Sequence, residues 1–318
     1  MKSKISSKDI TISGLLIALG IILPFATAHG IGVPGNILLP MHIPVLLAGF
    51  LCGPFLGGVI GLLLPVLNCL LTGMPALYPT LPGMAAELLT YGFVSGLLYK
   101  KTPLHKKKWG VYPALIVAMI SGRLVYGIVR YILLALDESV KALSVWDAVV
   151  KGLAGIVIQL VFVPAVVAAV ESGFARTKKS SVNSAKNLIS TDAAVLAVIK
   201  NGEIVKTYQG RGVVPAINAL EDGILNDAYI VDKVIGKASA MILSLGGVKG
   251  VTGVTMSRPA LEYLQSAGID AEYDVLCEYI ENRTKDGMCP MEQTVKDLSD
   301  PKAALEAVKA KQQELRSK

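Results

Sequence analysis

A few ionisable and polar side chains interrupt the apolar first half of the chain. Arg123, Tyr126 and Arg130 are spaced by three and four residues, so they share one face of a helix. Glu87 and Tyr91 are four residues apart and share a face of an earlier helix. Two arginines against one carboxylate leave a surplus positive charge, and a guanidinium can hold a carboxylate in a bidentate fork. The spacing predicts a site for a small anionic molecule or, alternatively, ion pairs that only fix helix packing.

Three further side chains are candidates for the same site. Gln159 is expected near the middle of a later helix, whereas His42 and Tyr78 lie in segments rich in glycine and proline, residues 28–44 and 72–82. We expect these segments to be non-helical and to fold over the site from outside. Either His42 or Tyr78 could instead be structural.

The elements that carry these side chains are too apolar for one soluble domain. Of 318 residues, 53% are hydrophobic and 17% are charged, and no Asp, Glu, Lys or Arg occurs from position 10 to position 86. At about 20 residues for each crossing, the sequence predicts an all-α membrane bundle of six helices. The expected spans are residues 10–27, 41–52, 55–71, 84–99, 111–136 and 146–170. The second span is short, so the second and third could form a tilted pair or a partly re-entrant hairpin.

Basic residues predict the orientation of these spans. Lys and Arg clusters precede the first span and follow the fourth and the sixth, and cytoplasmic loops accumulate such residues. We therefore expect a multi-pass protein of the cell membrane with both termini in the cytoplasm. Residues 1–175 hold 12 Lys and Arg against 6 Asp and Glu, so most of the net charge of +7 flanks the spans. This distribution does not favour nucleic acid as a partner.

The first span carries a pair of small residues, and the sequence contains no complete nucleotide-binding P-loop. Gly14 and Ala18 are four residues apart on the first span, a spacing that lets another helix approach closely. The nearest approach to a nucleotide-binding P-loop, at residues 231–238, has Val where the first Gly is needed and Ala where Ser or Thr is needed. We expect no ATPase in this chain.

With these features, the first half resembles the substrate-binding S components of energy-coupling factor (ECF) transporters, which import vitamins and their precursors. The resemblance covers about residues 8–172. It rests on six spans with cytoplasmic ends, on Gly14 and Ala18, and on the stretches MHIPVLLAGFLCGP at 41–54 and LTGMP at 71–75.

This resemblance implies partners and a site. The ridge of Gly14 and Ala18 would dock on a transmembrane T subunit, and two ATPase subunits would complete the importer. The substrate would be a small vitamin or precursor, niacin-like or otherwise anionic. By location rather than by motif, the family's substrate site maps onto Glu87, Tyr91, Arg123, Tyr126, Arg130 and Gln159, with His42 or Tyr78 above.

The polar second half predicts a soluble α/β sandwich. We expect a membrane domain at residues 1–172, a Ser-rich linker at 173–190, the α/β domain at 191–300 and a helical tail at 301–318. Asn201-Gly202 between two β-rich runs predicts a hairpin. The expected strands are residues 193–199, 203–208, 228–231 and 251–256, and the expected helices are residues 214–221, 233–245 and 259–267.

This half resembles the uncharacterised DUF1893 family through DAYIVDKVIGKASAMILSLGG at 227–247 and ENRTKDGMCPME at 281–292. The resemblance implies a cytidine-deaminase-like fold. Zinc deaminases need a His or Cys, a Glu two residues later and a P-C-x-x-C motif, but Lys237 and Ser239 occupy the first two positions. With two cysteines and no histidine in this half, we expect no metal site and no zinc deaminase. We assign no cofactor.

Four residues of the α/β domain remain candidates for a site: Asp232, Lys233, Lys237 and Cys289. Lys233 and Lys237 are expected one turn apart at a helix start, where backbone amides favour an anion, or else as a solvated pair. Cys289, at another expected helix start, could be a reactive thiol or an inert one.

Two functions remain open at this stage. The first is a substrate-binding membrane component of an ATP-driven importer that carries a cytosolic binding domain. The alternative is a membrane-anchored enzyme whose α/β domain modifies a nucleotide-like or vitamin-like metabolite. A mere anchor would not need Glu87, Arg123 and Arg130 inside the bilayer, so we favour the importer.

Overall fold

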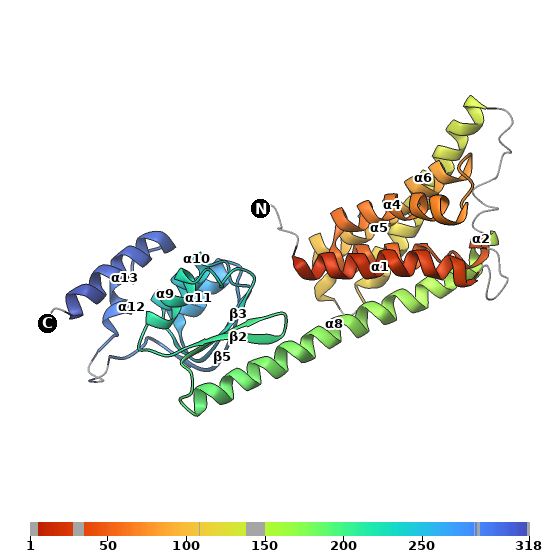
Figure 1. Cartoon of the computed structure of the whole chain (residues 1–318). Coiled ribbons are helices and arrows are strands. Elements are labelled where there is room, and N and C mark those ends of the chain that lie inside the picture. Colours follow the sequence, from red (N-terminus) through yellow and green to blue (C-terminus); the bar gives the residue numbers. More distant parts are fainter. Residues whose placement is uncertain are drawn as a thin grey trace. The chain divides into compact units, whose positions relative to one another are not determined.

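The computed structural model describes residues 6–27, 35–107, 109–137, 150–282, 284 and 287–316. The chain divides into two compact units, Met1–Ser172 and Gly173–Lys318 (Figure 1). The first unit is helical and the second contains a mixed sheet. The apolar half and the polar half of the sequence therefore fold as separate bodies.

The first unit is built from long apolar helices. Its elements are α1 (Ser7–Phe25), α2 (Gly35–Leu38), α3 (His42–Cys52), α4 (Pro54–Thr72), α5 (Thr80–Lys101), the 3₁₀ turn η2 (Pro103–Lys106), α6 (Val111–Leu136) and the first part of α8 (Leu153–Ser190). In the part of the chain that the structure describes, five helices are long and apolar enough to cross a membrane, and α3 is a shorter apolar helix. Several apolar helices were expected; six full crossings remain a prediction.

Sequence details explain where these helices begin and end. At α1, the Ser6 hydroxyl accepts the Asp9 amide while the Asp9 carboxylate accepts the Ser6 amide, which is a capping box. Gly53, at φ 93°, separates α3 from α4, and Pro54 begins the next helix. Gly73, at φ 72°, ends α4 in the left-handed conformation that favours glycine.

Two expectations about the membrane half need correction. We expected residues 28–44 to be non-helical, but residues 35–38 and 42–44 are helical; residues 28–34 lie outside the described part. The second segment expected to be non-helical, residues 72–82, is shorter than predicted, because α5 already begins at Thr80. The expected linker at 173–190 is also helical, because α8 continues to Ser190. Val182, Ala185 and Ile189 are buried, which gives this segment an apolar stripe that a solvated linker does not need.

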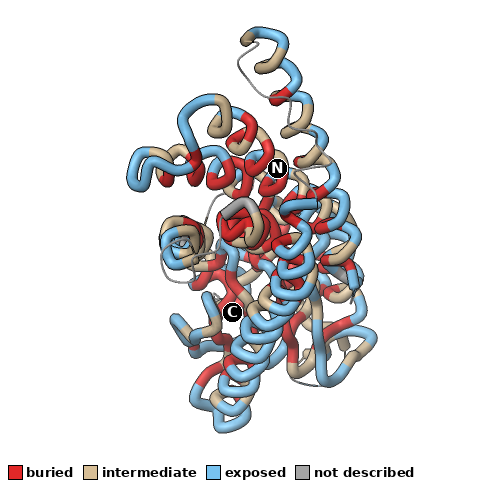
Figure 2. Tube along the Cα trace, turned by 90° about the vertical axis from the view of Figure 1, so that its right-hand side faces the viewer, coloured by how far each residue is buried: buried red, intermediate tan, exposed pale blue. Residues whose placement is uncertain are grey.

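The helices of the first unit share one core and expose wide apolar faces. Leu46, Phe50, Leu88 and Leu115 are fully buried between α3, α5 and α6, and buried and exposed stretches alternate along the long helices (Figure 2). The exposed side chains include Leu15, Phe55, Leu124 and Val161 at 59–68% exposure. Such a surface is costly in water and suits lipid.

The second unit is a five-stranded sheet between helices. Its strands are β1 (Leu196–Lys200), β2 (Glu203–Tyr208), β3 (Tyr229–Ile235), β4 (Gly250–Ser257) and β5 (Asp270–Cys277), in the order β2-β1-β3-β4-β5. β1 pairs antiparallel with β2 and β3, whereas β3, β4 and β5 are parallel. The helices are α9 (Val214–Glu221), α10 (Lys237–Leu245), α11 (Arg258–Ser266), α12 (Pro290–Thr294) and α13 (Pro301–Arg316).

Each face of the sheet has its own apolar cover. Leu196, Ile230 and Val251 pack with Met241 of α10 and Leu264 of α11 in the larger cluster. On the other face, the last turns of α8 pack on β1 and β3 in a smaller cluster, made by Val182, Ala185, Ile189, Ala197, Ile199 and Val231. The α/β character of this half is confirmed.

The structure corrects two local predictions in this unit. β3 runs to Ile235 instead of ending at residue 231, so α10 begins at Lys237 and not at residue 233. The run Val231 to Ile235 contains two charged residues, which suggested a helix start, but Asp232 is buried within the central strand. β5 was not predicted at all, because its sequence DAEYDVLC is polar and its residues are largely exposed at the edge of the sheet.

Candidate functional site

The facing sides of α5 and α6 meet as the sequence spacing predicts. Because the two helices are antiparallel, residues later in α5 face residues earlier in α6. A Cβ placed on Gly83 would lie 3.0 Å from the Tyr126 ring, Glu87 pairs with Arg123, and a Cβ on Gly122 would lie 2.0 Å from the Tyr91 ring. The Tyr91 ring therefore lies directly over Gly122, where any side chain would displace it.

Glu87 is the centre of a buried polar group that we call the Glu87 cluster: Glu87, Arg123, His42 and Tyr91. Arg123 Nη1 lies 3.1 Å from Glu87 Oε1, and His42 Nε2 lies 3.6 Å from the same oxygen. The His42 and Tyr91 rings are edge to face at 5.3 Å. Glu87 is only 2% exposed. The carboxylate is thus neutralised by Arg123, as the packing interpretation required, but the cluster also holds groups that no ion pair uses.

Several buried polar atoms here have no hydrogen-bond partner within the described part of the chain. They are His42 Nδ1, Arg123 Nε and Nη2, and both polar atoms of the Gln159 amide. Gln159, on α8, is fully buried. Buried polar atoms in proteins almost always have partners, so such groups require an explanation. Donors and acceptors are both available at these positions for a polar molecule.

An open hollow of about 340 Å³ adjoins the cluster. It is lined by Tyr91 and Arg123, by apolar residues of α6 including Met119, and by Ile156 and Leu160 of α8. Ile156 and Leu160 are the residues three before and one after Gln159. The hollow therefore brings α8 to the same two side chains that the Glu87 cluster uses.

Arg130 contacts a different part of the chain from Arg123. Its Nη1 donates to the Pro79 carbonyl at 3.3 Å, and its Cδ lies 3.6 Å from the position of a Gly83 Cβ. Partial burial, followed by the Asp137 carboxylate, raises the pKa of the Tyr78 hydroxyl, and the positive charge of Arg130 lowers it. Tyr78, Arg130 and Asp137 thus interact at the ends of α5 and α6, one turn or more from Glu87.

His42 is placed differently from the sequence expectation. It begins α3, is 1% exposed and contacts Glu87, so it does not lie in a non-helical loop above the site. The expected span at residues 41–52 already included His42, and the apolar run after His42 is the signal that prevails over the nearby glycines and prolines.

Gly14 and Ala18 lie on an exposed face of α1. Both are exposed, and no atom outside the helix lies within 4 Å of a Cβ placed on Gly14. Leu15 and Ile22 of the same helix are 62% and 58% exposed. Small and apolar residues therefore leave this helix open to close packing by another helix.

In the second unit, Asp232 has an unusual environment. It is 2% exposed in the central strand, and its Oδ1 accepts the Val234 amide at 3.3 Å. Burial raises the pKa of Asp232 to about 7, although the amides of Val234 and Lys233 and the hydroxyl of Ser239 favour the ionised form. This carboxyl can therefore change its charge near neutral pH.

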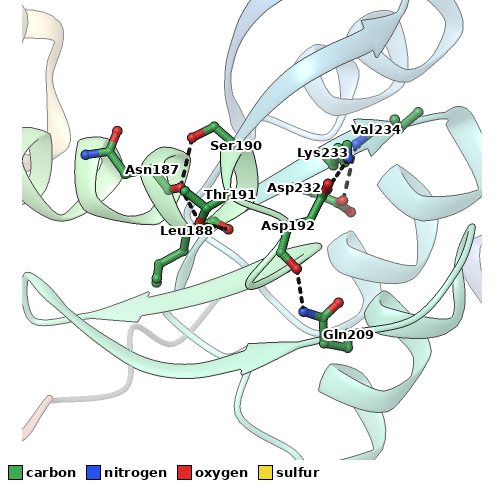
Figure 3. Close-up of polar contacts among 9 residues, drawn as sticks. All are labelled: Asn187, Leu188, Ser190, Thr191, Asp192, Gln209, Asp232, Lys233 and Val234. Atoms are coloured by element: carbon green, nitrogen blue, oxygen red, sulfur yellow. Dashed lines mark hydrogen bonds and ion pairs between the residues drawn. The ribbon is translucent and has the colours of Figure 1, made fainter.

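The two lysine candidates do not form a pair. Lys233 lies on β3 and its Nζ reaches Asp192 Oδ1 at 2.6 Å, while Gln209 donates to the Asp192 carbonyl at 2.9 Å (Figure 3). Lys237 starts α10, and its Nζ donates to the Lys296 carbonyl at 2.5 Å. The expectation that both lysines lie at one helix start is wrong, because β3 continues past Lys233.

Glu292 was missed from the sequence, and it organises this end of the unit. Its buried carboxylate accepts the Ser257 hydroxyl, the Lys237 amide at 3.2 Å and the Ile280 amide at 2.6 Å. Cys289 precedes it at the start of α12, and the Cys289 amide donates to the Ile280 carbonyl at 2.7 Å. No local pattern could reveal Glu292, since its partners are distant in sequence. Among the described residues, no group of His, Cys, Asp and Glu is arranged to hold a metal.

Long apolar helices, exposed apolar faces and a buried polar cluster define a membrane protein that carries a second, α/β unit. The sequence model described as "ECF transporter, substrate-specific component" matches residues 8–167, about half of the chain. The chain therefore belongs to the family of ECF transporter substrate-specific components, which are transporter components and not enzymes. The model described as "Domain of unknown function (DUF1893)" matches residues 184–312. Both resemblances seen in the sequence are confirmed.

Comparisons with individual proteins add little to this assignment. No curated protein matches the chain. A crystal structure of a DUF1893 family protein from Thermotoga maritima has 23% sequence identity to this chain and a TM-score of 0.39, over 42% of this chain and 90% of that one.

Proposed function

We propose that this protein is the substrate-binding subunit of an ATP-driven ECF importer for a small, anionic vitamin or vitamin precursor. The substrate would lie against the Glu87 cluster and Gln159, with Tyr126, Arg130 and Tyr78 on the side of the outer loops. The observation that carries the proposal is the group of buried polar atoms without partners at Arg123, His42 and Gln159.

The donors that Arg123 leaves unused favour an anionic ligand. Arg123 pairs with Glu87 through Nη1. The Nε and Nη2 atoms of Arg123 remain available to donate to a carboxylate, which guanidinium groups bind in a bidentate geometry. His42 and Gln159 can supply further hydrogen bonds. A ligand that uses these donors would remove the cost of leaving them unpaired.

The partners and topology follow from the same proposal. The exposed face of Gly14 and Ala18 would dock on the transmembrane T subunit, and two ATPase subunits would supply the energy. α3 would complete a bundle of six spans with both termini in the cytoplasm. The second unit would have a deaminase-like fold, with its α/β domain at residues 191–300, and would be a cytosolic accessory binding domain.

Substrate binding can be tested with the purified full chain in detergent. We would measure thermal unfolding in the presence of water-soluble vitamins, with nicotinate as the first anionic probe. A stabilising vitamin should lose its effect in Arg123→Gln and Gln159→Leu. Arg176→Gln, which makes the same change at an exposed arginine in α8, should keep it. The proposal fails if no compound stabilises the chain, or if Arg123→Gln responds like the unmodified protein.

Transport can be tested by co-expression with a T subunit and two ATPases. Uptake of the stabilising compound should require all subunits and should be lost when Gly14 and Ala18 are both replaced by Leu, because the larger side chains block close helix approach. Binding by the purified Gly14→Leu/Ala18→Leu protein should persist. Unchanged uptake by this double variant would contradict the docking role of α1.

A further inference from the structure

The second unit contains an open groove of about 510 Å³, which is in the size range of small-molecule sites. Val234, Thr255 and Cys277 contribute to it, and they lie at or near the carboxyl ends of β3, β4 and β5. The segment from Glu278 to Glu281 forms the remaining wall. In open α/β sheets, ligands bind outside the carboxyl ends of the parallel strands. We call this hollow the carboxyl-end groove.

The wall of the groove is fixed by hydrogen bonds. The Ile280 amide donates to the buried Glu292 carboxylate at 2.6 Å, and the Ile280 carbonyl accepts the Cys289 amide at 2.7 Å. Glu281 forms an isolated antiparallel bridge with Met288. Arg258 donates through Nε and Nη2 to Glu278 Oε1, at 3.1 and 3.0 Å. These contacts hold the segment in one conformation, so the groove is formed before any ligand arrives.

The chemistry of the lining is apolar and acidic. Val234 and Tyr279 expose 41% and 40% of their surface, which leaves an aliphatic and an aromatic side chain open to a ligand. Glu278 and Glu281 are both exposed, and no Lys or Arg is among the described residues that line the groove. Arg258 neutralises Glu278, whereas Glu281 forms no salt bridge with any residue that the structure describes. Among the described lining residues, the Glu281 carboxylate is therefore the charged group left outside a salt bridge.

The Cys277 thiol lies near three carboxylates. Burial raises its pKa, and the carboxylates of Glu292, Glu281 and Glu278 raise it further. These carboxylates place a negative potential at the sulfur, which lines the groove. Phosphate-bearing ligands are disfavoured by this potential.

We propose that the carboxyl-end groove binds a small aromatic cation. The cationic ring would stack against the Tyr279 side chain and pack on Val234, with its positive charge near Glu281. A cation over an aromatic ring is attracted by the negative face of the ring, and a carboxylate beside it adds a Coulombic contact. This ligand is opposite in charge to the one proposed for the membrane half, so the two sites are distinguishable in one protein.

The test uses three forms of one ring: 1-methylnicotinamide is cationic, nicotinamide is neutral and nicotinate is anionic. Binding to the full chain in detergent would be measured by saturation-transfer NMR and titration. We expect 1-methylnicotinamide to bind at least about fivefold more tightly than nicotinamide, the effect of one partly exposed charge contact. Nicotinate should show no binding that depends on the groove.

Variants locate the binding site. Glu281→Gln should weaken 1-methylnicotinamide about fivefold and leave nicotinamide unchanged, and Tyr279→Leu should weaken both. Glu203→Gln removes an exposed carboxylate from β2, at the opposite edge of the sheet, and should change neither. Arg123→Gln in the membrane half should not alter the cation's affinity. The proposal is overturned if the cation binds no better than nicotinamide, or if Glu281→Gln and Glu203→Gln behave alike.

Discussion

The two units hold buried carboxylates by opposite means. Glu87 and Glu292 are equally inaccessible, at 2% and 3% exposure. Glu87 is balanced by the guanidinium of Arg123, and the atoms around it are only partly hydrogen-bonded. Glu292 accepts two backbone amides and a hydroxyl, all within its own unit. The difference shows that Glu292 serves the architecture of its unit, whereas the Glu87 cluster keeps hydrogen-bonding capacity that folding does not consume.

The largest expected effect is on the ion pair in the membrane half. Glu87→Gln or Arg123→Met alone leaves an uncompensated buried charge, which destabilises proteins by about 3–5 kcal/mol. The free energy of unfolding would be measured by titration with sodium dodecyl sulfate. The double variant should be more stable than either single one, because neither charge remains. Equal, additive losses would show that Glu87 and Arg123 are not coupled.

Next in size is the pH dependence of the second unit. Because the pKa of Asp232 is raised from 3.8 to about 7, the folded unit binds more protons than the unfolded chain between these values. Its stability should therefore fall as pH rises, by about 2–3 kcal/mol from pH 4.5 to 6.5, and level off above pH 7. Asp232→Asn should abolish this component.

Pulse proteolysis in urea would measure the second unit within the full chain. Asp297→Asn, the same change at an exposed residue of that unit, is the matched control and should keep the slope. If the slope is the same in Asp232→Asn and in the unmodified chain, Asp232 is not the group that titrates.

A smaller effect should follow from overpacking beside the cluster. Gly122→Ala places a methyl group 2.0 Å from Tyr91, which must move and carry its contact with His42 along. We expect a loss of about 1–3 kcal/mol together with loss of vitamin-dependent thermal stabilisation. Gly173→Ala, where no atom outside the helix lies within 4 Å, should be neutral or slightly stabilising. If Gly122→Ala loses neither stability nor the vitamin effect, the Tyr91 ring is not held in place.

The smallest effect is expected at a partly exposed ion pair between α8 and β5. Lys186 Nζ lies 2.5 Å from Asp274 Oδ1, and both side chains are partly exposed. Lys186→Gln should cost about 0.2–1 kcal/mol, less at high salt, because solvent screens such pairs. Urea unfolding at two salt concentrations would measure it. If Lys186→Gln lowered the free energy of unfolding as much as Glu87→Gln does, the buried pair and the exposed pair would not differ in strength.

Periodic and short-range features could be predicted from the sequence. That the Glu87 face of one helix meets the arginine face of the next follows from helical spacing on adjacent, oppositely directed spans. The spacing does not show which arginine pairs with Glu87. The hairpin at Asn201-Gly202 follows from turn chemistry. The strand through Asp232 could not be predicted, because a buried acid in a central strand contradicts β-propensity and is tolerated only through tertiary contacts. Glu292 and β5 were missed for a related reason: their partners lie far away along the chain.

The attachment of Glu292 to Lys237, Ser257 and Ile280 has a consequence for the carboxyl-end groove. The start of α10, the end of β4 and the wall of the groove are fastened at one point. Lifting the short helix α12 would release all of them together, so this corner of the unit should open as a single cooperative block rather than fray residue by residue. The hydrogen bonds to Glu292 that hold α12 in place would then also slow the release of a compound bound in the groove.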